Sequence, residues 1–173
     1  AIPAAFESED YRTRRQVIDQ QYKEKQEEAF DKVSQRAAEK GVVIMRTPLG
    51  VGLAIAKDGQ PLSSEEFQQL PPKEREHLQA EMDTIHQLLE AVFRQVPKWE
   101  SEQRQKIRDL NRETTRFAIG HLISGIRERY QDLSNVLEHL EVVEQDLVEN
   151  AGRFLVHSQT EQLENPLEQA LGR

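Results

Sequence analysis

The side chains best suited to chemistry in this sequence are its histidines and carboxylates. A zinc site on a helix needs a His-Glu-x-x-His motif or two histidines four residues apart. The chain has five histidines and none meets either condition: His77, His86, His121, His139 and His157. We interpret all five as ordinary surface or core residues, so no metal ligand is predicted.

Neighbouring carboxylates such as Glu27 with Glu28 are the second candidate, because a carboxylate pair can act as acid and base. With 31 Asp and Glu residues in a chain of 173, such pairs are expected on solvated helix faces and at helix starts. The eight glycines are scattered and no Gly-x4-Gly-Lys-Ser/Thr loop occurs, so no phosphate site is predicted. The sequence therefore predicts no catalytic and no cofactor-binding residue.

An apolar stretch over 42–56 is the remaining candidate for function, and its pattern is typical of a β-hairpin. A β-branched run is followed by a Thr-Pro-Leu-Gly turn, after which bulky residues alternate with Gly and Ala. An unfolded protein exposes apolar side chains and unpaired backbone, and the edge of an apolar hairpin can accept both. The candidate substrate-binding residues are Val43, Met45, Leu49, Val51, Leu53 and Ile55. The alternative is that these side chains simply pack on neighbouring helices.

Two long helical stretches flank the hairpin and would position it. In the second stretch, 71–130, apolar residues recur at alternating steps of four and three: Leu78, Met82, Ile85, Leu89, Val92, Val96 and Trp99. These steps define the narrow seam of a coiled coil, which needs a partner helix. Pro97 lies inside the pattern without a backbone N–H, so we expect a kink or break near Val96. The seam then resumes at Leu110, Thr114 and Phe117.

The partner helix is predicted over 8–41. Ser8 precedes acidic residues as an N-cap does, and Gly41 suits the end of a helix. A stripe at helical spacing lies between them, formed by Tyr11, Arg15, Ile18, Tyr22, Ala29, Val33 and Ala37. The connection to the second helix is long enough to reverse direction, so we expect an antiparallel pair.

The fold class predicted from these patterns is mainly α: an elongated antiparallel coiled coil or helical bundle with a small β-hairpin. We expect an N-terminal lead-in at 1–7 and a coiled-coil arm formed by 8–41 and 72–112. The hairpin and a short helix capped by Ser63 or Ser64 occupy 42–71. A helical base follows at 113–157, with a break over 131–134, and a linker or frayed end at 158–173.

Composition argues against several kinds of partner. The formal net charge of -8 argues against a general binder of nucleic-acid backbones. The chain has no cysteine, and hence no disulfide or thiolate metal site, which is compatible with a reducing cytosol. Its apolar runs are only a few residues long, so neither a signal peptide nor a membrane span is predicted. We expect a cytoplasmic protein with no nucleic-acid and no membrane partner.

Several motifs occur in order along the whole chain. They are the segment 1–11 beginning Ala1-Ile2-Pro3, then Arg46-Thr47-Pro48-Leu49-Gly50, then the segment 57–67 beginning Lys57-Asp58-Gly59. Further motifs follow at Leu110-Asn111-Arg112-Glu113, Gly120-His121-Leu122-Ile123 and Asp146-Leu147-Val148-Glu149-Asn150. Together they resemble the helical insert of bacterial Lon-like proteases of peptidase family S16 that carry an atypical AAA+ module. The start at Ala1 and the Asn165-Pro166-Leu167 tail lead us to expect a fragment of a longer polypeptide.

The resemblance implies a non-catalytic role for this region. In such proteins it is joined to an ATPase-like module and followed by a protease domain with a Ser-Lys dyad. Neither the dyad nor a nucleotide loop matches any residue of this chain. ATP and magnesium would therefore belong to the parent polypeptide, an ATP-dependent serine endopeptidase that assembles as a ring-shaped homo-oligomer. The AAA+ and protease domains of that polypeptide are the implied partners.

We predict a non-catalytic helical domain that contributes to substrate engagement or entrance architecture in protein degradation, with unfolded proteins as its substrates. The alternative is a structural spacer or oligomerisation coiled coil without substrate contact, since a seam satisfied within the chain leaves only polar residues outside. The sequence leaves open whether the two arms of the coiled coil meet within one chain or by exchange between chains. It also leaves open whether the parent ATPase module is active.

Overall fold

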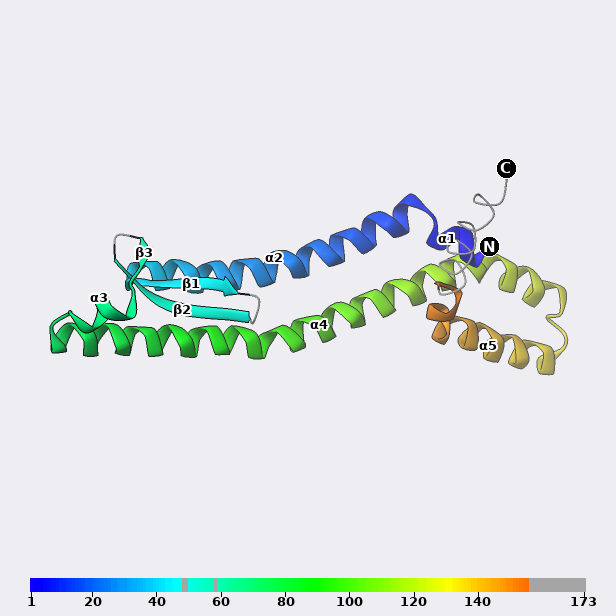
Figure 1. The fold of residues 1–173 in the computed structure, drawn as a ribbon. Coiled ribbons are helices and arrows are strands. Elements are labelled where there is room, and N and C mark those ends of the chain that lie inside the picture. The colour runs from blue at the N-terminus through cyan, green and yellow to red at the C-terminus, as the bar shows by residue number, and fades with distance from the viewer. Residues whose placement is uncertain (48–49, 58, 156–173) are drawn as a thin grey trace, which may run out of the picture. The chain divides into compact units, whose positions relative to one another are not determined.

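The computed structural model describes residues 1–47, 50–57 and 59–155 (Figure 1). Its elements are, in chain order, α1 (Ile2–Phe6), α2 (Glu9–Glu39), β1 (Val42–Thr47), β2 (Gly50–Lys57), β3 (Gln60–Pro61), α3 (Ser64–Gln68), α4 (Pro72–Arg129) and α5 (Ser134–Glu149). The three strands form an antiparallel sheet in the order β1-β2-β3. The predicted mainly α class with a small hairpin is confirmed.

The chain folds as two compact units. The hairpin unit is Gln21–Ser101, and the terminal unit comprises Ala1–Gln20 together with the described residues from Glu102 onward. Helices α2 and α4 each contribute residues to both units. The residues of the arm expected at 8–41 and 72–112 are therefore divided between the hairpin unit and the terminal unit.

Local signals define both ends of α2. The backbone N–H of Tyr11 donates to Ser8 Oγ at 3.2 Å, which confirms the predicted cap. Gly41 has a φ of 70°, a left-handed conformation that glycine adopts without a Cβ clash and that ends the helix, as predicted. The Gly41 carbonyl then accepts the N–H of Ala56 at 2.8 Å. The end of α2 thus leads directly into the sheet.

The hairpin has the predicted strands in a continuous register from Val42 opposite Ile55 to Thr47 opposite Gly50. Strand β3 was not predicted, because two residues that include a proline show no alternation. It pairs with β2 only at Ala56 and Lys57. After it, Ser63 Oγ accepts the N–H of Glu66 at 3.2 Å and the Ser63 N–H donates to Glu66 Oε2 at 2.8 Å, a capping box that starts α3.

Helix α4 is continuous over 58 residues with Pro97 inside it. Of the kink or break expected near Val96, the break is wrong, because the helix continues through Pro97. A proline removes one intrahelical hydrogen bond, whereas side chains on both sides of it, Leu89 and Trp99, are buried. Their packing holds the two halves of α4 in one helix.

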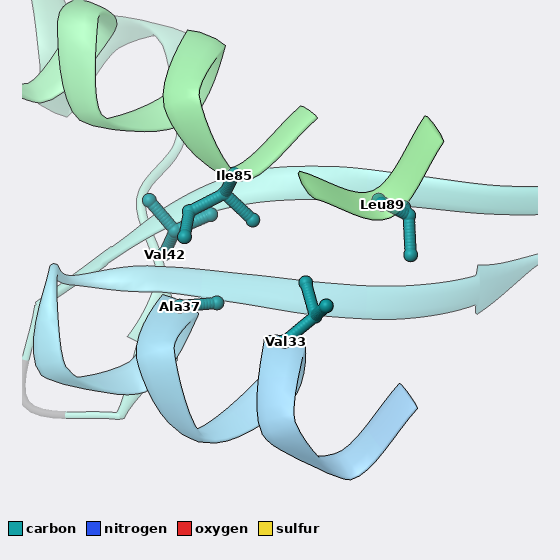
Figure 2. Close-up of a cluster of buried hydrophobic side chains, with 5 residues drawn as sticks. All are labelled: Val33, Ala37, Val42, Ile85 and Leu89. Atoms are coloured by element: carbon teal, nitrogen blue, oxygen red, sulfur yellow. The ribbon is translucent and has the colours of Figure 1, made fainter. Parts of the chain in front are cut away.

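The core of the hairpin unit joins two helices and the sheet. Val33 and Ala37 come from α2, Val42 from β1, and Ile85 and Leu89 from α4. Figure 2 shows these five side chains converging, with the strands running between the two helices. Lys25 Nζ lies 5.3 Å from the centre of the Trp99 ring, and Lys40 Nζ lies 3.1 Å from Glu81 Oε1. Within this unit α2 and α4 therefore run antiparallel.

The terminal unit is held by α1, the start of α2, α4 and α5. Buried apolar residues form two clusters, one of Phe6, Tyr11, Leu110 and Ala151 and one of Ile119, Ile123 and Val148. The Tyr11 hydroxyl donates to Asn111 Oδ1 at 2.8 Å, and the Phe6 and Tyr11 rings meet edge to face with centroids 4.9 Å apart. Arg127 Nη2 pairs with Glu144 Oε2 at 2.9 Å, which links α4 to α5.

Phe117 does not lie on a buried seam, because 84% of it is exposed. The prediction for this residue is wrong. Helix α2 begins at Glu9, so beyond the level of Tyr11 the neighbours of α4 are α1 and α5. These neighbours cover a different face of α4, on which Thr115, Ala118 and Ile119 are buried.

The predicted break after Tyr130 is confirmed, and α5 follows it. The residue before α5 is Leu133, which makes no side-chain capping bond, so Ser134 is the first helical residue rather than the cap. Asn150 ends α5, and helical backbone resumes over 151–155. Within the described residues, no helix combines the length and apolar character that crossing a membrane requires.

A forked ion pair joins α2 to α4 in the terminal unit. Arg14 donates from Nη1 to Glu113 Oε1 at 3.1 Å and from Nη2 to Glu113 Oε2 at 2.6 Å. This hydrogen bond, reinforced by the charge of Arg14, lowers the pKa of Glu113. A lowered carboxyl pKa contributes stability above the unfolded pKa, and that contribution is lost as the pH falls through the folded pKa.

Replacing Glu113 with Gln is expected to lower the free energy of unfolding by about 0.5 kcal/mol at pH 7, because the pair is largely exposed and screened by solvent. Urea titrations followed by circular dichroism at low salt measure this difference. It should disappear once the pH has fallen below the folded pKa of Glu113, because the carboxyl group is then protonated in both states. The control Glu138→Gln removes a carboxylate on α5. It should leave the free energy of unfolding unchanged both at pH 7 and at low pH. A Glu113→Gln deficit that does not shrink as the pH is lowered through the titration of this carboxyl group would contradict the electrostatic explanation.

Candidate functional site

A groove lies between β2 and α4 in the hairpin unit. It has a volume of about 320 Å³ and is lined by Val51, Leu53, Met82, Asp83, His86, Leu89, Glu90 and Phe93. The first two residues belong to β2 and the other six to α4. Those six recur at helical steps, so one face of α4 forms one wall of the groove.

The groove is apolar and open to solvent. Leu89 is buried, whereas Phe93 is 47% exposed and Val51 is 37% exposed. Single exposed apolar side chains are common on proteins and need no explanation. Here Val51 and Phe93 border the same groove. Ligand-binding sites are typically concave and mostly apolar.

The backbone of β2 beside the groove has an open edge. Because Ala56 is bonded to Gly41 on the β1 side, the alternation of an antiparallel ladder directs the N–H and C=O of Val51, Leu53 and Ile55 away from β1. The Ile55 carbonyl accepts the N–H of Leu62 at 2.8 Å. On the side away from β1, no strand within the described ranges pairs with β2 at Val51 or Leu53.

The charged groups of the groove are acidic. Its lining contains the carboxylates Asp83 and Glu90 and neither Lys nor Arg. His86 Nε2 lies 3.2 Å from Glu90 Oε1, and Gln79 Nε2 donates to Asp83 Oδ1 at 3.3 Å. An apolar segment that carries a basic residue is the ligand chemistry that this arrangement favours.

The six candidate residues from the sequence occupy different environments. Val51 and Leu53 line the groove together, and Leu53 also packs against the core. Ile55 is buried with 8% exposure. Val43 and Met45 are half-buried and lie opposite Ala54 and Gly52 across the hairpin, outside the groove lining. Leu49 lies outside the described residues.

Sequence reasoning missed the contribution of α4 to this groove. Met82 and Leu89 were assigned to the seam with the first helix, and Phe93 follows the seam residue Val92 directly. In the structure all three line the groove. The available signal was Phe93 itself, a large aromatic residue off the seam and without an assigned neighbour.

Among the described residues, no group of three or more His, Cys, Asp or Glu side chains is placed to hold a metal ion. No protein-family model, curated protein sequence or solved structure matches this chain. The resemblance to Lon-like proteases therefore stays a prediction based on the order of motifs in the sequence.

Proposed function

We propose that this chain is a non-catalytic helical domain of a Lon-like, ATP-dependent serine protease and that it engages unfolded protein substrates. The observation that carries the substrate-binding role is the apolar groove beside the open edge of β2, where Val51 and Phe93 are exposed. The order of motifs from Ala1 to Asn150 supports the Lon-like assignment. ATP and magnesium would act in the parent ATPase module.

An extended substrate segment can bind this groove by strand addition. Its backbone would pair with the outward N–H and C=O groups of Val51 and Leu53, and alternate side chains would then enter the groove toward Phe93. A folded protein has most of its backbone groups paired and most of its large apolar side chains buried. The groove would therefore select unfolded segments.

Binding by a single copy is expected to be weak, with a Kd on the order of 10–100 µM, because the groove accommodates only a few side chains. A ring of the parent polypeptide would present several grooves to one substrate. Binding at a second groove would then be intramolecular, which raises the overall affinity without any new contact.

The coiled-coil part of the proposal concerns α2 and α4. Their antiparallel course within the hairpin unit, marked by the contacts of Lys25 with Trp99 and Lys40 with Glu81, supports an arm that presents the groove to substrates. The neighbouring AAA+ and protease domains of a cytoplasmic, ring-forming parent would receive the substrate from it.

The test is fluorescence anisotropy of labelled reduced and carboxymethylated α-lactalbumin, a permanently unfolded protein, titrated with the full 173-residue chain. The unfolded protein should bind, and native α-lactalbumin should not. The double replacement of Val51 and Phe93 with Ser should weaken binding at least tenfold, because both side chains border the groove. Both residues are partly exposed, so the fold should persist.

The matched control is Phe117→Ser, which removes an exposed aromatic side chain in the terminal unit. It should leave binding unchanged. An equal loss for Phe117→Ser would contradict a specific groove. Absence of binding to about 500 µM, well above the expected range, would favour a structural spacer or oligomerisation coiled coil, which light scattering would reveal as concentration-dependent association.

A further inference from the structure

A second groove adjoins the first along α4. It has a volume of about 520 Å³ and is lined by Phe67, Pro72, Arg75, Glu76, Gln79, Ala80 and Asp83. Phe67 comes from α3 and the other six residues from α4. Asp83 lines both grooves. The α4 residues of the two linings recur at steps of three and four from Pro72 to Phe93, so both grooves lie on one face of the helix.

From this arrangement, and resting on the function proposed above, we infer that the two grooves form one track for an extended polypeptide with two apolar anchor residues. One anchor occupies the groove at Val51 and Phe93, and the other occupies the groove at Phe67. A basic side chain between the anchors faces Asp83.

The geometry of α4 sets the spacing of the anchors. His86 and Glu76, which lie near the middle of the two α4 linings, are ten positions apart in the sequence. Ten helical residues span roughly 15 Å at 1.5 Å per residue. An extended chain covers that distance in about four or five residues at 3.3 Å each. The ligand segment is therefore short enough to be a single strand.

The second groove has a well-defined wall, since the capping box of Ser63 and Glu66 fixes the start of α3. Phe67 follows within this helix and is half-buried. Its ring, with Pro72 and Ala80, supplies apolar surface in the second groove. An aliphatic or aromatic anchor suits this surface.

The charge along the track determines which ligand residue is favoured between the two apolar anchor residues. Glu76, Asp83 and Glu90 line the two grooves, against one cation, Arg75. Asp83 is shared by both grooves and lies between the anchor positions. A Lys or Arg there gains a favourable interaction with this carboxylate, whereas an acidic residue is repelled.

The experiment compares fluorescein-labelled peptides built on a Gly-Ser background and titrated with the full chain. One has two leucines four positions apart with a lysine midway between them, so that all three side chains lie on one face of an extended strand. The second keeps only one leucine, and the third replaces the lysine with glutamate. The two-leucine peptide should bind about fivefold tighter than the one-leucine peptide, because a second side chain is partly buried. The glutamate peptide should bind several-fold more weakly than the lysine peptide.

Variants assign the effects to the second groove. Phe67→Ser should reduce the affinity for the two-leucine peptide to that for the one-leucine peptide and leave the latter unchanged, which also shows that the first groove is intact. Asp83→Asn should remove the preference for lysine over glutamate. The control Gln69→Ser, at the end of α3, should change neither the gain in affinity from the second leucine nor the preference for lysine over glutamate.

The outcomes separate this inference from the proposed function. If the one-leucine peptide binds and depends on Val51 but the second leucine adds nothing, the track is wrong and the single groove stands. If Phe67→Ser weakens both peptides equally, the second anchor site is likewise refuted. If no peptide and no unfolded protein binds, both the track and the proposed function are wrong.

Discussion

Replacing Ile85 with Ala is expected to lower the free energy of unfolding of the hairpin unit by about 3 kcal/mol. Ile85 has no exposed surface and packs among residues of α2, β1 and α4. Truncation removes three methyl or methylene groups and leaves a cavity. Because both α2 and β1 pack against α4 at this position, neither can move to fill that cavity without losing other contacts.

Urea unfolding followed by tryptophan fluorescence measures this effect. Trp99 is the single tryptophan of the chain and is buried in the hairpin unit, so it reports on the correct part of the molecule. The control Val51→Ala shortens a partly exposed side chain on β2 and should cost only about 0.5 kcal/mol. A loss below about 1 kcal/mol for Ile85→Ala would contradict the tight packing described here.

Replacing Tyr11 with Phe is expected to lower the free energy of unfolding of the terminal unit by about 2 kcal/mol. The substitution keeps the ring that packs against Phe6 and removes the hydroxyl that donates to Asn111 Oδ1. Asn111 is only 7% exposed. Its side chain would then be buried without this donor, and an unsatisfied buried polar group costs more than the bond itself contributes.

A double replacement distinguishes this cause from a general packing defect. Adding Asn111→Leu to Tyr11→Phe removes both polar partners and should recover most of the lost stability. Amide hydrogen exchange in α5, which packs in the same unit through Val148, provides the readout. A double variant that is less stable than Tyr11→Phe alone would contradict the hydrogen-bond explanation.

The hairpin contributes both to the buried core and to the groove, and mutations must separate the effect on folding from the effect on binding. Val42 belongs to the buried core, and Leu53 both packs against that core and lines the groove. Substitution of Leu53 would therefore change stability and binding together. Val51 and Phe93 border the groove while remaining partly exposed, so they report on binding with little effect on folding. This is why the binding test uses them.

Signals that act within a few residues were predictable from the sequence. Four features depend on backbone conformations and hydrogen bonds between near neighbours. They are the cap at Ser8, the left-handed Gly41, the pairing of the hairpin strands and the capping box at Ser63. Residue types report such interactions directly, since each arises from the local geometry of the chain. The mainly α class follows from the same kind of signal.

The terminal part of α4 shows the limit of this reasoning. The heptad steps place Phe117 on the seam, but its exposure depends on where α2 begins and on which face α5 covers. The continuity of α4 through Pro97 likewise depends on contacts made by Leu89 and Trp99 with other elements. Periodicity identifies an apolar face, whereas the partner that covers that face is a long-range property.

The candidate site likewise has some features that the sequence determines and others that depend on long-range packing. The sequence by itself determined that 42–56 is an apolar hairpin and that Val51 and Leu53 share one face of its second strand. Only the tertiary structure decided that this face meets Phe93 across a groove, that the adjoining edge of β2 is open, and that Asp83 joins this groove to the one at Phe67. The physical reason is that a groove is a relation between elements distant in the chain, set by how α3, β2 and α4 pack, and no local spacing encodes it.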